Sequence, residues 1–107
     1  MLPTLRIEKI DQGEYHGRIL DGRELLGEVW QSTIADVIGE TARHYQPAPK
    51  AFNVYYGPVS VGTTLREAML YDAETLAQRL VRLEEVLPPK ARKPMRLDYR
   101  KGSQVNR

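Results

Sequence analysis

The sequence predicts an α+β fold, a two-layer sandwich in the order β-β-β-α-β-β-α, with a mostly antiparallel sheet and both helices on one face. Three observations predict this fold. Residues 4–30 alternate apolar and polar side chains between glycine-containing turns. Two later segments, residues 34–45 and 73–87, repeat apolar residues at helical spacing. Residues 51–56 alternate again, which adds a strand between the two helices.

Three strands are predicted over residues 4–10, 14–20 and 23–30, with turns at Gly13 and Gly22. A three-residue second loop gives the better register, because it places apolar residues opposite one another on one face. The expected cross-strand pairs are Leu5 with Ile19, Ile7 with Gly17, Tyr15 with Val29, Gly17 with Gly27, and Ile19 with Leu25. The paired glycines would form a notch that lets a helix approach the sheet closely.

The boundaries of both helices are indicated by capping and stop residues. Thr33, followed three residues later by Asp36, approximates a capping box, and Pro47 ends the helix that it begins. Asp72 is predicted to be the N-cap of the second helix, which the proline pair at Pro88 stops. Both helices are amphipathic, so we expect their apolar sides to face the sheet.

The segment between the fourth strand and the second helix has the least regular pattern. Val59 to Val61 looks extended, whereas Thr64 and Glu67 have the spacing of a helix start. We expect one or two short strands that end at Tyr71.

Charge divides the chain at Leu87. Residues 1–87 hold nine Lys and Arg against thirteen Asp and Glu, a net charge of −4, whereas residues 88–107 hold seven against one, a net charge of +6. Three prolines and many charges give this last segment too little apolar surface to offset the entropy of ordering. The sequence therefore predicts a single α+β domain over residues 1–87 and a flexible basic tail over residues 88–107.

Composition excludes several classes of function. The chain has no cysteine, which rules out disulfides, thiolate metal sites and cysteine nucleophiles. Its apolar runs are too short for a membrane span or a signal peptide, so we expect a cytoplasmic protein without a membrane partner. Residues 57–64 contain glycines and hydroxyls but lack the lysine and the spacing of a phosphate-binding loop. No cofactor is predicted.

The leading functional hypothesis rests on the sheet face that the helices leave open. Apolar anchors among charged residues on such a face are typical of a protein interface, where the anchors exclude water and the charges fix orientation. We therefore expect a non-catalytic interaction module that self-associates, as a homodimer for example, or binds a protein partner. The expected binding residues are the anchors Leu20, Leu26, Trp30 and Tyr55 and the orienting pair Arg18 and Glu28.

The alternative hypothesis is a nucleic-acid-binding accessory protein that uses its basic tail. Basic side chains release counterions from a polyanion, and tyrosine or arginine can stack on bases. The residues that would do so are Lys90, Arg92, Lys93, Arg96, Tyr99, Arg100 and Lys101. A solvated tail or contact with an acidic partner explains the same residues.

Neither histidine predicts a catalytic or metal centre. His16 is expected between Glu8 and Glu28 on neighbouring strands, where a metal site is conceivable but an exposed cross-strand ion pair is the commoner arrangement. His44 follows Glu40 by four residues, as on an exposed helix face. The sequence therefore assigns no catalytic and no metal-binding residue.

Overall fold

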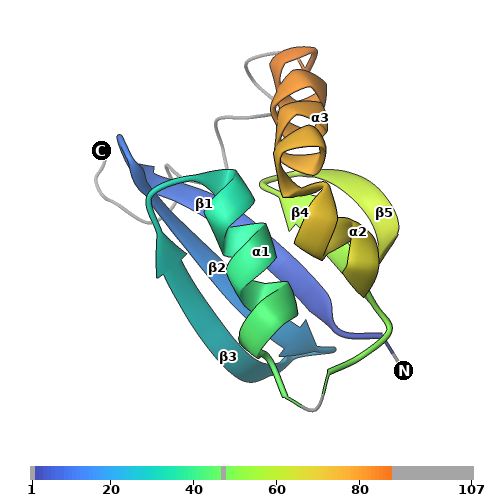
Figure 1. The fold of residues 1–107 in the computed structure, drawn as a ribbon. Coiled ribbons are helices and arrows are strands. Elements are labelled where there is room, and N and C mark those ends of the chain that lie inside the picture. Colours follow the sequence, from blue (N-terminus) through green and yellow to red (C-terminus); the bar gives the residue numbers. More distant parts are fainter. Residues whose placement is uncertain (1, 47, 88–107) are drawn as a thin grey trace, which may run out of the picture.

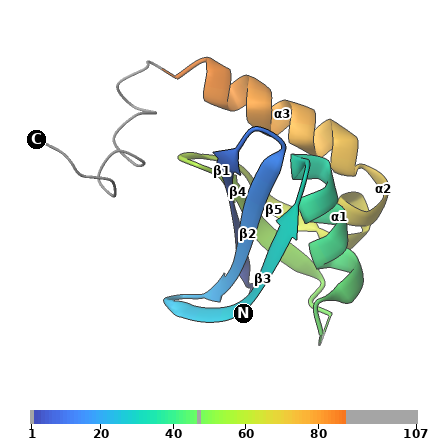
Figure 2. The ribbon, with the colours of Figure 1, turned by 90° about the vertical axis from the view of Figure 1, so that its left-hand side faces the viewer.

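The computed structural model describes residues 2–46 and 48–87. The elements within these ranges are β1 (Thr4–Asp11), β2 (Glu14–Asp21), β3 (Glu24–Gln31), α1 (Ile34–His44), β4 (Ala51–Tyr56), β5 (Val59–Leu65), α2 (Arg66–Tyr71) and α3 (Ala73–Glu85). The strands form one sheet in the order β3-β2-β1-β4-β5, and the helices gather on one side of it (Figures 1 and 2). The predicted fold class is confirmed.

Strand β1 lies at the centre of the sheet. It pairs antiparallel with β2 and parallel with β4, and the other two neighbouring pairs are antiparallel. The register of the first hairpin is confirmed, because Leu5 pairs with Ile19 and Ile7 with Gly17. The helix α1 makes the crossover from β3 that allows β4 to run parallel to β1 (Figure 1).

The predicted pairing of β2 with β3 is wrong by two residues. Gly17 lies opposite Val29, and Ile19 lies opposite Gly27. The turn is tight, with Asp21 paired to Glu24, and a β-bulge then leaves Leu26 as an extra residue in β3. Although the turn is short, the extra residue of the bulge lets the later residues of β3, such as Val29, keep their predicted inward or outward orientation.

The bulge also reverses one predicted orientation. Leu25, expected on the inward face opposite Ile19, instead pairs with Leu20, and its residue surface is 47% exposed. The expected pair of facing glycines does not form, since Gly17 and Gly27 are staggered along their strands.

Close approach of a helix to the sheet nevertheless occurs, at Gly17 alone. A Cβ atom added there would lie 2.5 Å from Val37 Cγ1 of α1 and 3.2 Å from Leu5 Cδ1. A Cβ atom added at Gly27 would meet only Ile19 Cδ1, at 3.5 Å, which is an ordinary contact. Glycine is therefore needed at position 17 for α1 to pack where it does.

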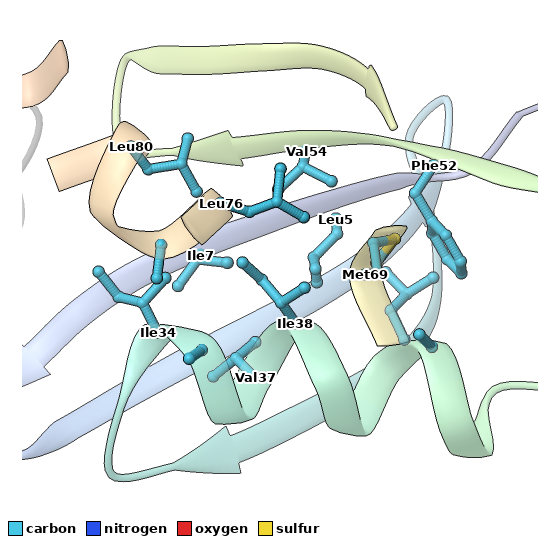
Figure 3. Close-up of a cluster of buried hydrophobic side chains, with 14 of the residues drawn as sticks. Leu5, Ile7, Ile34, Val37, Ile38, Phe52, Val54, Met69, Leu76 and Leu80 are labelled. Carbon is cyan, nitrogen blue, oxygen red and sulfur yellow. The ribbon is translucent and has the colours of Figure 1, made fainter. Parts of the chain in front are cut away.

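The hydrophobic core fills the space between the helices and the inward sheet face (Figure 3). All three helices and the central strands contribute to it. Its fully buried side chains include Leu5 and Ile7 from β1, Phe52 and Val54 from β4, Val37 and Ile38 from α1, Met69 from α2, and Leu80 from α3. Burial of each large side chain stabilises the fold by about 1.5–3 kcal/mol.

Residues 66–71 form the helix α2, and the prediction of strand structure up to Tyr71 is wrong there. The expected strand is real but ends at Leu65. Arg66 begins the helix and donates a hydrogen bond from Nε to the carbonyl of Ala42 at 2.8 Å, which joins α2 to the end of α1. The helix buries Met69 against the core. This tertiary contact stabilises a helix that is too short to be stable alone.

The two predicted N-caps differ in the structure. The Asp36 amide donates a hydrogen bond to Thr33 Oγ1 at 3.0 Å, as predicted for α1. Asp72 precedes α3 but makes no side-chain capping bond. The positions of both caps are thus as predicted, but only Thr33 caps through its side chain.

This difference gives a first prediction. Thr33→Ala should lower the free energy of unfolding by about 1 kcal/mol, because the Asp36 amide loses its acceptor. Asp72→Ala should change it by less than about 0.5 kcal/mol, the usual range for a surface substitution without such a bond. Urea denaturation of both variants checks this, and equal losses would contradict it.

Candidate functional site

The outer face of the sheet, on the side away from the helices, carries the predicted binding residues. The face can be followed along three cross-strand rows. The first row runs through Glu8, His16 and Trp30, the second through Tyr55, Arg6, Arg18 and Glu28, and the third through Thr63, Asn53, Thr4, Leu20 and Leu25.

Trp30 is stacked on His16 in the first row. The two ring centroids are 3.9 Å apart and the ring planes differ by 11°. His16 Nε2 also lies 3.1 Å from Glu28 Oε1, and the His16 side chain is only 14% exposed. Trp30 itself remains 52% exposed. The indole is thus held in place by its neighbour while much of its surface faces solvent.

The second row contains both positively and negatively charged residues. Arg6 and Arg18 lie directly opposite each other on β1 and β2. Arg6 stacks its guanidinium over the Tyr55 ring, 4.6 Å from the centroid, and Arg18 Nη2 lies 3.8 Å from Glu8 Oε2. Exposed ion pairs of this kind contribute about 0–1 kcal/mol, so they orient side chains more than they stabilise the fold.

Three of the nine exposed large hydrophobic residues in the described ranges lie on β3, at the edge of the sheet. Besides Trp30, these are Leu25 and Leu26 at the bulge, with Leu26 38% exposed. Leu20 lies beside them on β2, opposite Leu25. Leu20 therefore lies beside the bulge that holds Leu25 and Leu26, and Trp30 lies further along β3, beyond Glu28. We call Leu20, Leu25, Leu26 and Trp30 the β3 patch.

The predicted orienting pair lies next to the β3 patch, and the fourth predicted anchor does not. Arg18 and Glu28 pair directly across β2 and β3. Tyr55 shares the outer face but is separated from Trp30 by β1 and β2, and it is engaged by Arg6.

Leu25 and His16 are the two residues that sequence reasoning missed. Consecutive leucines on a strand were the only available signal for Leu25, because a bulge can expose both. The support that His16 gives to Trp30 depends on the correct register and has no local sequence signal.

Each histidine lies against a glutamate side chain. His16 approaches Glu28, while Glu8 lies beside Arg18. His44 Nε2 is 3.3 Å from Glu40 Oε2, and Arg43 Nη2 binds the other oxygen of the same carboxylate at 3.0 Å. Within residues 2–46 and 48–87, no three His, Asp or Glu side chains are grouped so that they could hold a metal ion.

The predicted nucleic-acid-binding residues Lys90 to Lys101 lie outside the described residues, so that alternative stays a prediction. None of the helices in the described part of the chain is long and apolar enough to cross a membrane.

The geometry of the outer face is the sole guide to function. Comparison of the chain with protein-family models, with curated proteins and with solved structures gives no match.

Proposed function

We propose that this protein is a non-catalytic interaction module that binds another protein molecule through the outer face of its sheet, with the β3 patch as anchor, and that a second copy of the chain is the partner that fits best. The observation that carries the proposal is Trp30, 52% exposed yet fixed by its stack on His16. Tryptophan buries about 150–250 Å² and is enriched among residues that dominate binding energy. We also propose a cytoplasmic location, with which a chain that has no cysteine is compatible.

The charge pattern supports a second copy as the partner. A symmetric dimer brings the same surface together from both molecules, so the surface must complement itself. The outer face meets this requirement because the cations Arg6 and Arg18 lie among the anions Glu8 and Glu28. Rotation about a twofold axis can place cations of one copy against anions of the other.

The size of the face predicts a weak dimer. Three strands of eight residues and β4 of six, at about 3.3 Å per residue and spaced about 4.8 Å apart, give a four-strand face of roughly 500 Å². Two such faces bury about 1,000 Å², at the lower limit for specific interfaces. We therefore expect an equilibrium between monomer and dimer that depends on protein concentration.

The test is sedimentation equilibrium of the full chain over a range of concentrations. The wild type should show a rising average mass, whereas Trp30→Ala should remain monomeric, because loss of an anchoring tryptophan can cost about 2 kcal/mol or more of binding energy. Tyr71→Ala is the matched control, since Tyr71 is also an exposed aromatic residue but lies on α2.

Circular dichroism should show that both variants keep the wild-type fold. A wild type that is monomeric throughout, or a Trp30→Ala variant that associates like the wild type, would contradict the proposal.

A further inference from the structure

Strand β3 ends the sheet on one side, and its outer edge has no neighbouring strand among the described residues (Figure 2). Its eight residues include two glutamates and neither lysine, arginine nor proline. Such an edge offers unpaired main-chain groups to another strand. The opposite edge, β5, is interrupted by a bulge after Ser60 and by Gly62 at φ +81°, so β3 is the better template.

A groove of about 360 Å³ follows this free edge beneath α1. On one side it is lined by residues 27–31 of β3, and on the other by Glu40, Thr41 and His44 of α1 and by Tyr45, which follows the helix. Successive residues of a strand point to opposite faces of the sheet. Five consecutive residues can therefore line the same groove only if the groove runs along the main-chain edge of the strand. A strand edge flanked by a helix is an arrangement that accepts an added extended segment.

One wall of the groove contains an unsatisfied hydroxyl group. Thr41 is 1% exposed, and its Oγ1 has no hydrogen-bond partner among the described residues. A buried hydroxyl without a partner costs about 1–3 kcal/mol. An additional polar group in the groove would remove that cost.

We propose that residues 95–101 of this chain add to β3 as a sixth, antiparallel strand in this groove. Met95, Leu97 and Tyr99 alternate in this segment with Arg96, Asp98 and Arg100, and no proline interrupts it. Alternation places the first set toward α1, where Ile19, Val29 and Tyr45 line the groove. The second set then joins the outer face.

The charges along β3 favour this segment as the added strand over the β3 strand of a second molecule. Two β3 strands side by side would place four glutamates along the seam with no cation from either strand. In the added strand, Arg96 and Arg100 stand on the same face as Glu28 and Trp30, where ion-pair and cation–π contacts are favourable.

The length of the connection permits the proposal. Glu85, in the last turn of α3, lines a groove together with Ser32, the residue directly after β3. Seven residues, 88–94, connect Leu87 to the segment, and they reach about 25 Å when extended. The added strand would lie two strand spacings, about 10 Å, from β2. Because the connection begins near the end of β3, the added strand runs antiparallel to it.

The test is amide hydrogen exchange of the full chain, measured by NMR at a concentration where the protein is monomeric. Leu97→Pro removes a main-chain donor and prevents strand pairing. It should speed exchange of the β3 amides that point away from β2, on the free edge of the strand, by about tenfold, which corresponds to the loss of about one hydrogen bond. Val105→Pro is the control, because it introduces the same residue beyond the segment and should leave exchange unchanged.

Equal β3 exchange rates in the wild type and in Leu97→Pro would overturn the proposal. So would protection that disappears on dilution together with the dimer, since it would assign the strand to a second molecule. Neither variant alters a residue of the five strands and three helices described, so both should keep the five-stranded sheet. The inference does not rest on the proposed dimer, and a monomeric wild type leaves it intact.

Discussion

Gly17→Ala should lower the free energy of unfolding by about 2–3 kcal/mol, because an added methyl group overpacks a well-filled core. The new Cβ would lie 2.5 Å from Val37 Cγ1, so α1 or the sheet must move. Urea denaturation measures the loss. Gly27→Ala is the matched control on the neighbouring strand, where the new Cβ makes only an ordinary contact with Ile19 and the change should stay within about 0.5 kcal/mol.

A double-mutant cycle identifies the cause. Val37→Ala removes the clashing methyl groups, so it should cost at least 1 kcal/mol less in the Gly17→Ala background than in the wild type, a coupling within the usual range for residues in contact. Additive effects of the two substitutions would show that close packing of α1 at Gly17 is not the reason for glycine at this position.

Phe52→Ala should lower the free energy of unfolding by about 3–5 kcal/mol, the largest effect that we expect from one substitution. Phe52 is fully buried and makes an edge contact with the Tyr45 ring, with centroids 6.2 Å apart. Small domains are typically stable by about 5–15 kcal/mol, so a large part of the stability would be lost.

The measurement for Phe52→Ala is again urea denaturation. Tyr55→Ala, on the same strand but on the outer face, is the comparison, and it should cost about 1 kcal/mol or less because it loses only the contact with Arg6. A similar loss in both variants would mean that the core is not centred on the inward face of β4.

Local signals predicted most of the fold correctly. The Thr33 cap, the alternation over residues 51–56 and the register of the first hairpin depend on neighbouring residues, and all are confirmed. The helix α2 was missed because its six residues bury only Met69, too few for apolar periodicity to appear. Arg66 and Ala42, whose contact joins α2 to α1, are 24 residues apart in the chain.

The candidate site was predicted in part for the same reason. Alternation alone identifies which side chains leave the core, and Trp30 is indeed exposed. The residues that lie next to it depend on register, and one bulge at Leu26 shifts that register. His16 lies beside Glu8 and contacts Glu28 as expected, but Trp30 rather than Glu28 lies directly opposite it on β3.

The central position of β1 has a consequence for the order of folding. β1 emerges first during synthesis, and its hairpin partner β2 follows at once, but Thr4 pairs with Asn53, 49 positions further along the chain. Closing a loop of this length costs about 3.4 kcal/mol in chain entropy before the parallel contacts form. We therefore expect the seam between β1 and β4 to close late, because it cannot form until β4 has been synthesised, and the sheet is complete only when β5 follows.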